Sequence, residues 1–176
     1  RGSVDHPLNP LTLALGAGAT WVARSMDRNP AHLRDQLAKS QAHQGSALLE
    51  SYQNCNVFHD GAFEVWTDKS TQALHSVFLE VGKPIAWGGT EPTHALAWNG
   101  GRPEIRELGS EFGLADAWLH DPSDRLKAFA LAALEGPLRP FGVLYAAERP
   151  VFAASHQAGT RPLHDVLHSG RTWTVE

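Results

Sequence analysis

The sequence has little of the chemistry from which extracellular and membrane proteins are built. Its 176 residues include a single cysteine, which cannot form an internal disulfide. Nothing therefore points to an oxidising compartment, and we predict a cytoplasmic protein. No run of about 18 apolar residues occurs, so we expect no transmembrane helix and no membrane partner. No signal-peptide pattern is visible either.

Excess positive charge is also missing. The chain has 15 lysine and arginine residues against 19 aspartate and glutamate residues, which gives a net charge of -4. This balance argues against nucleic acid as a partner. Apolar residues make up 42% of the chain and charged residues 19%, which is typical of a globular protein. The chain opens on Arg1-Gly2, and we expect it to be a segment of something longer.

Two helix–strand pairs are predicted at the start of the chain. Asn9-Pro10 and Asn29-Pro30 each indicate a helix start, because asparagine can cap free amides and proline suits the first helical position. Strands are predicted at Thr20–Arg24 and Ala47–Tyr52. This alternation favours an α/β fold with parallel strands, whose ligands collect beyond the carboxyl ends of the strands. Cys55 lies three residues beyond the second predicted strand.

The rest of the chain is less regular. We expect an exposed loop over residues 59–70, one or two strands with a turn at Gly82 over residues 73–89, and mostly surface over residues 101–113. A helix is predicted over residues 123–134 and a last strand over Phe141–Ala147. One helix face is expected to hold Leu33, Leu37 and Ala38, and another to hold Leu126, Phe129, Ala130 and Ala133.

Cys55 carries the most distinctive chemistry, and several readings of it are open. A lone cysteine is often a small buried hydrophobe, but its neighbours here are polar: Gln53, Asn54, Asn56, His59 and Asp60. A nucleophilic thiol would need a base, for which His59 is the local candidate. A zinc site would need three further ligands, and no close Cys/His spacing supplies them. An iron–sulfur cluster would need thiolates from outside this segment.

Histidines offer one further possible metal pair. His164 and His168 stand four residues apart and would share a face if their segment were helical. No glutamate completes the known protease motif there, so the residues alone point to an α/β segment with one unexplained thiol.

Three stretches resemble a known family. "NPLTLALGAGATWVARS" is similar to that family's helix and "GATFVAR" strand, "QNCNVFHDGAF" to its "QNCPVFNDGAF" loop, and "FGVLYAAERPVF" to its closing strand and "ERPTY" exit. The family is the thiamine-diphosphate-binding β subunit of 2-oxoacid:ferredoxin oxidoreductases, which act on pyruvate or 2-oxoglutarate. Asn56 stands where proline is common, and His59 where asparagine is common.

The resemblance implies a set of cofactors and partners. The enzyme would decarboxylate a 2-oxoacid oxidatively to an acyl-CoA and reduce ferredoxin, with an α subunit as partner. Cys55 would be the fourth ligand of a [4Fe–4S] cluster, and no catalytic residue is expected in this chain. Thiamine diphosphate and Mg²⁺ would be bound mainly by an upstream "GDGD" segment that, with three further cysteines, is not in this sequence. The chain alone is therefore expected to be inactive.

The implied architecture is a three-layer α/β parallel-sheet part of a thiamine-diphosphate-binding domain, followed by an irregular C-terminal extension. We divide the chain into residues 1–66 with the cluster-ligand loop, residues 67–153 as the C-terminal region of the β subunit, and residues 154–176 as a polar tail. The alternatives are a non-catalytic α/β partner-binding module in which Cys55 is structural, and a thiol enzyme that uses Cys55 and His59.

Overall fold

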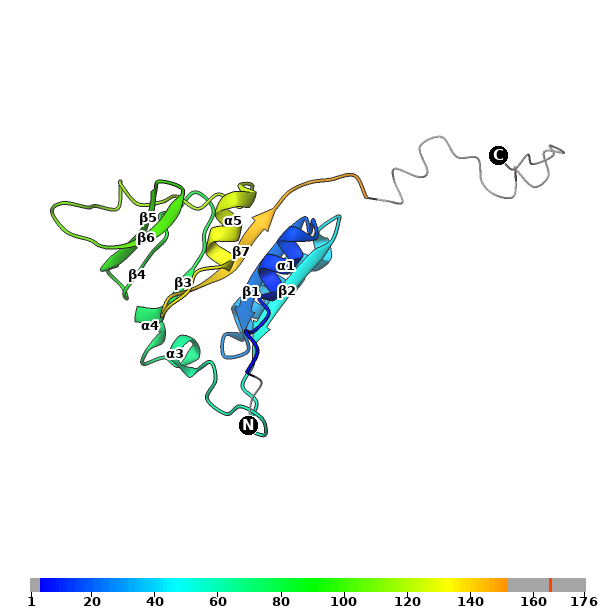
Figure 1. Cartoon of the computed structure of the whole chain (residues 1–176), viewed down its shortest axis with the longest axis horizontal. Coiled ribbons are helices and arrows are strands. Elements are labelled where there is room, and N and C mark those ends of the chain that lie inside the picture. The colour runs from blue at the N-terminus through cyan, green and yellow to red at the C-terminus, as the bar shows by residue number, and fades with distance from the viewer. Residues whose placement is uncertain (1–3, 152–164, 166–176) are drawn as a thin grey trace.

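The computed structural model describes residues 4–151 and residue 165 (Figure 1). Its helices are α1 (Pro10–Gly16), α2 (Pro30–Ala42), α3 (Glu64–Thr67), α4 (Gln72–His75) and α5 (Arg125–Ala132). Its strands are β1 (Trp21–Met26), β2 (Ala47–Tyr52), β3 (Ser76–Phe78), β4 (Ala86–Trp87), β5 (His94–Asn99), β6 (Arg102–Glu107) and β7 (Arg139–Ala146). The tail predicted over residues 154–176, with its His164 and His168 pair, lies outside the described residues apart from residue 165.

Both predicted helix starts are confirmed, and each is capped as expected. The Asn9 side chain accepts hydrogen bonds from the backbone N–H groups of Leu11 and Thr12, each at 3.1 Å. The Asn29 side chain accepts one from the N–H of His32 at 3.2 Å. Both helices continue from a proline, so local chemistry fixes where the chain turns helical.

The larger sheet has the order β2-β1-β7-β3 and carries the α/β character expected from the sequence. The pairs β1–β2 and β3–β7 are parallel, as predicted. The pair β1–β7 is antiparallel, so the sheet is mixed rather than wholly parallel. Gly142 helps β7 fit between its neighbours, because a Cβ atom there would lie 3.1 Å from the Leu79 carbonyl oxygen and the residue has a φ of 109°.

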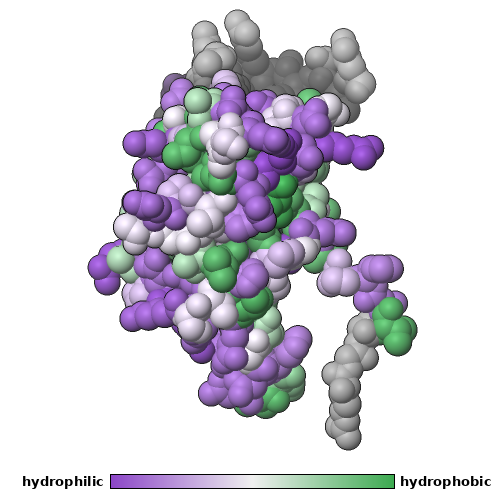
Figure 2. Space-filling view, turned by 90° about the vertical axis from the view of Figure 1, so that its left-hand side faces the viewer, coloured by the Kyte–Doolittle hydropathy of each residue, from purple (hydrophilic) through white to green (hydrophobic). Residues whose placement is uncertain are grey.

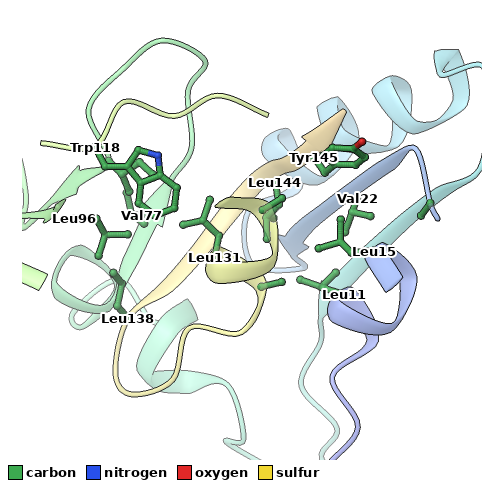
Figure 3. Close-up of a cluster of buried hydrophobic side chains, with 14 of the residues drawn as sticks. Leu11, Leu15, Val22, Val77, Leu96, Trp118, Leu131, Leu138, Leu144 and Tyr145 are labelled. Carbon is green, nitrogen blue, oxygen red and sulfur yellow. The ribbon is translucent and has the colours of Figure 1, made fainter. Parts of the chain in front are cut away.

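Helices cover both faces of this sheet and enclose the main core. Figure 3 shows α1 and α5 in front of the strands and α2 behind them. Ten of the buried side chains are labelled there: Leu11, Leu15, Val22, Val77, Leu96, Trp118, Leu131, Leu138, Leu144 and Tyr145. β1 is buried along its whole length, whereas β2 forms an edge and is partly exposed. The centre of the sheet is therefore buried, and its β2 edge is partly accessible to solvent.

Two predicted helix faces are confirmed only in part: Leu33 of α2 is half-buried, and Phe129 and Ala130 of α5 pack against the main core, but the other members do not. Leu37 and Ala38 of α2 are exposed, and the residue that this helix buries is Gln36. In α5 the side chain of Leu126 is 78% exposed, while Ala128, Leu131 and Ala132 are buried. The reason is tertiary: α5 packs against α1 and β7 together, which turns a face rich in alanine inward. Helical spacing alone could not identify the partner elements.

A second sheet, of order β4-β5-β6, was not predicted. β5 and β6 are antiparallel and are joined through Gly100 and Gly101, which both have positive φ. The expected turn at Gly82 is confirmed, with a φ of 73° and a 3.1 Å bond from the Lys83 N–H to the Glu80 carbonyl. Figure 2 looks onto this side of the molecule, where hydrophilic residues cover most of the face and hydrophobic ones lie in patches between them.

Strands from both sides of residue 66 share the larger sheet, and the proposed division at that residue stays a prediction.

The segment expected as a loop over residues 59–70 includes the one-turn helix α3. Within the described residues, every helix is too short or too polar to cross a lipid bilayer.

Candidate functional site

The loop that carries Cys55 begins at the carboxyl end of β2. β1 and β2 are parallel and in register from Trp21↔Ala47 to Met26↔Tyr52, so both strands end at the same edge of the sheet. The Asp27 N–H donates to the Tyr52 carbonyl at 3.0 Å and closes the last step of this ladder. Cys55 lies three residues beyond the end of β2, in the position past the strand ends that the sequence predicted.

Aromatic stacking holds the two arms of this loop together. The Tyr52 ring, at the end of β2, stacks on the Phe63 ring with a centroid distance of 4.3 Å and an interplanar angle of 23°. The Arg24 guanidinium lies 5.3 Å from the Tyr52 ring centroid, and its Nε donates to Glu50 at 2.5 Å. Arg24 is buried, so its charge is paired and also supports the ring at the root of the loop.

Polar contacts organise the tip of the loop. Residues 55–59 form a tight turn in which the His59 N–H donates to the Cys55 carbonyl at 3.0 Å. Asn54 bonds across the turn to Asp60 and Gly61. Gly61 has a φ of 76°, a left-handed conformation that glycine adopts without a Cβ penalty. The loop is therefore closed by its own hydrogen bonds.

Cys55 is an exposed free thiol at this tip. Hydrogen bonding by the backbone N–H groups of Phe58 and Val57, and to a smaller extent by that of His59, lowers the pKa of the thiol below its ordinary value. A lower pKa favours the thiolate, which is the form that attacks electrophiles and binds metals. Val57 and Phe58 are themselves 82% and 89% exposed, so two apolar side chains flank an accessible sulfur.

The geometry of the loop bears on two of the hypotheses for Cys55, the buried packing residue and the nucleophile activated by His59. The reading of Cys55 as a buried packing residue is wrong, because the residue is exposed. The hydrogen bonds that His59 makes to Cys55 come from its backbone N–H, and within the described residues no bond joins the His59 ring to the sulfur. The pairing of His59 with the thiol as a catalytic base is therefore not formed in this structure.

The described residues fit one ligand of a cluster and no complete metal site. No group of three or more histidine, cysteine, aspartate or glutamate side chains gathers among residues 4–151 in a way that could hold a metal ion. The Cys55 environment suits a cluster thiolate, because amide donors aimed at the sulfur stabilise its negative charge. The sequence singled out Cys55 but did not indicate that Asn54 bonds to Asp60 and Gly61, although the dipeptide Asp60-Gly61 is itself a typical turn signal.

Comparison with known proteins gives relatives of one kind. No protein-family model matches the chain. The 2-oxoglutarate oxidoreductase subunit KorB of Mycobacterium tuberculosis is 33% identical over 193 aligned residues, which cover 99% of this chain and 50% of that protein. A 2-oxoacid:ferredoxin oxidoreductase subunit β from a Sulfolobus species is 30% identical over 77 residues, which cover 44% of this chain and 25% of that subunit.

A solved structure supports the fold. A 2-oxoglutarate:ferredoxin oxidoreductase from Magnetococcus marinus, with 2-oxoglutarate, coenzyme A and succinyl-CoA bound, matches with a TM-score of 0.59 and 17% sequence identity. The match covers 97% of this chain and 47% of that one, so the chain spans about half the length of KorB and of this structure. The resemblance noted in the sequence is thus confirmed: this chain is a relative of the β subunits of 2-oxoacid:ferredoxin oxidoreductases and corresponds to their C-terminal portion.

Proposed function

We propose that the chain is part of the β subunit of an enzyme that decarboxylates a 2-oxoacid oxidatively to an acyl-CoA and reduces ferredoxin. In this proposal Cys55 is one thiolate ligand of a [4Fe–4S] cluster, and the 2-oxoacid is 2-oxoglutarate or pyruvate. The observation that carries the proposal is the exposed Cys55 thiol on a loop that is closed by the Asn54 hydrogen bonds at the carboxyl ends of β1 and β2.

The residues of this chain have defined tasks in the proposal. When bound, the cluster would accept electrons one at a time and pass them to ferredoxin. The amides of Val57 and Phe58 hold negative charge on the Cys55 sulfur, and the Tyr52–Phe63 stack fixes the loop to the sheet. Val57 and Phe58 are available to pack against the part of the subunit that supplies the other three ligands and binds thiamine diphosphate and Mg²⁺. An α subunit and a cytoplasmic location complete the proposal.

The cluster assignment is tested in the complete enzyme, purified without oxygen as the β subunit with its α subunit. Cys55→Ala removes the thiol and supplies no oxygen that could bind iron in its place, while the Asn54 hydrogen bonds that close the loop are retained. We expect iron and acid-labile sulfide to fall, by the content of one cluster, together with the visible absorbance of that cluster. Iron and sulfide contents equal to those of the unaltered enzyme would contradict ligation by Cys55.

A second variant separates the cluster from a thiol-enzyme mechanism. His59→Gln removes the candidate base and leaves the Cys55 sulfur and its amide donors in place. We expect this variant to keep its iron content and its 2-oxoacid-dependent, CoA-dependent reduction of ferredoxin. Loss of activity with full iron content would favour the thiol mechanism, in which His59 must accept the thiol proton.

A further inference from the structure

Asn54 makes more hydrogen bonds than any other side chain of the Cys55 loop for which bonds are described. Its Oδ1 accepts from the Gly61 N–H at 2.9 Å. Its Nδ2 donates to Asp60 Oδ1 at 2.8 Å and to Asn56 Oδ1 at 2.7 Å. The flanking residues Gln53 and Cys55 are exposed, whereas Asn54 is half-buried beneath the turn. The amide group thus uses both its acceptor and its donors inside the loop.

These bonds join the two ends of the segment that presents the sulfur. Asn54 stands immediately before Cys55, and Gly61 closes the turn that contains all the amide donors directed at that sulfur. Fixing Gly61 to Asn54 therefore limits the positions available to the intervening backbone. The loop has few buried apolar contacts at its tip, since Val57 and Phe58 point to solvent, so hydrogen bonding must supply most of its order.

A second set of contacts, which does not involve Asn54, holds the loop where it leaves and returns to the sheet. The Tyr52–Phe63 stack, with Arg24 above Tyr52, joins the arms at the sheet. Removing the Asn54 amide should consequently loosen the tip while the arms stay in place. This separation makes the contribution of Asn54 measurable without unfolding the chain.

We propose that Asn54 is the positioning residue of the Cys55 ligand: by bonding Gly61, Asp60 and Asn56 it holds the sulfur and its amide donors in the arrangement that the cluster requires. The inference rests on the proposed function of Cys55 and goes beyond it, since it assigns the geometry of the ligand to the neighbouring side chain. Asn54 does not touch the cluster in this account and acts only through the loop.

The closure itself is tested in the 176-residue chain by amide hydrogen exchange. In Asn54→Ala the Gly61 N–H loses its acceptor, and we expect its exchange to be roughly tenfold faster, the effect of losing one hydrogen bond. Gln53→Ala is the matched control, since Gln53 is exposed and adjacent to Asn54; its Gly61 exchange should equal that of the unaltered chain. Unchanged exchange in Asn54→Ala would overturn the inference.

A double substitution tests whether the bond to the Gly61 N–H can be restored. Asn54→Asp combined with Asp60→Asn places the carboxylate at position 54 and the amide at position 60, with no change in net charge. The carboxylate can still accept from Gly61, and the amide at position 60 can donate to it. We expect Gly61 exchange close to that of the unaltered chain, whereas Asn54→Asp alone sets two carboxylates 2.8 Å apart and should not recover it.

The link to the cluster is tested in the complete enzyme by electron paramagnetic resonance, the midpoint potential and the rate of iron loss to a chelator. We expect Asn54→Ala to alter the spectrum and the potential and to release iron roughly tenfold faster. In the double variant Asn54→Asp with Asp60→Asn, all three properties should return close to those of the unaltered enzyme. Faster Gly61 exchange with an unchanged spectrum, potential and iron release would overturn the inference and leave Cys55 ligation intact. Failure of the Cys55→Ala test would instead overturn the proposed function, and the Gly61 exchange would then report only a structural turn.

Discussion

The centre of the larger sheet and the Cys55 loop are ordered by different forces. Phe141 of β7 is fully buried and contacts the rings of Phe78 and Tyr52, with centroid distances of 5.7 and 5.6 Å. Phe58 in the loop is 89% exposed, and its segment is held by hydrogen bonds to Asn54 and to the turn backbone. The sheet is therefore stabilised by burial, whereas the loop is shaped by directional polar contacts that leave its apolar tip free.

The largest expected effect comes from removing the same ring in the two regions. Phe141→Ala should lower the free energy of unfolding by about 3–5 kcal/mol, because it deletes a buried side chain and leaves a cavity. Phe58→Ala should change it by less than about 0.5 kcal/mol. Urea denaturation of the chain followed by circular dichroism measures both. Similar losses in the two variants would contradict the distinction between the regions.

A smaller effect concerns the pH dependence of the buried region. The Nε2–H of His120 donates to the Val143 carbonyl at 2.8 Å, and its buried Nδ1 has no hydrogen-bond partner within the described residues. Burial lowers the pKa of His120 below its usual 6.5, against the opposing influences of the Val143 bond and Asp121. Protonation would place a second N–H where nothing accepts it.

The sign of this effect follows from which state binds the proton first. Above pH 6.5 neither state is protonated and the contribution is constant. As the pH falls below that value the unfolded chain binds the proton before the folded one, so the free energy of unfolding falls, by at most about 1.4 kcal/mol per pH unit for one histidine. Urea titrations at pH 7.5, 6.5 and 5.5 measure it. His120→Gln should have a shallower slope, and an equal slope would exclude His120 as a contributor.

The smallest effect is expected at Cys55, the proposed cluster ligand. Cys55→Ser should change the free energy of unfolding of the chain by less than about 0.5 kcal/mol, because the side chain is exposed and the loop is closed by Asn54 and Gly61. The same urea denaturation measures it. A loss above about 1 kcal/mol would mean that the thiol supports the fold, and the division between a stabilising sheet and a functional loop would fail.

Local signals in the sequence predicted the elements that position Cys55. Asn9 and Asn29 mark helix starts because a cap acts within three residues, and the predicted strand Ala47–Tyr52 matches β2 at both ends. The location of Cys55 beyond a strand end followed from these boundaries. Its exposure and its amide donors did not, because they depend on how residues 56–61 fold back.

Long-range pairing explains most of what the sequence did not reveal. The antiparallel placement of β7 and the inward face of α5 depend on partners far away in the chain. The hairpin of β5 and β6 had a usable signal, since Gly100-Gly101 separates two strand-length segments and Gly-Gly is typical of tight hairpin turns. The Tyr52–Phe63 stack joins residues on either side of the loop and becomes visible only once the loop closes.

The position of β7 has a consequence for biosynthesis. β7 lies between β1 and β3, yet residues 27–138 must be synthesised after β1 before β7 begins. Until then the nascent chain exposes an unpaired edge of β1, a strand whose residues are all buried once the chain is folded. A product that terminates before Arg139 should accordingly be recognised by chaperones or proteases, so the stable presentation of the Cys55 loop depends on β7, which is synthesised long after it.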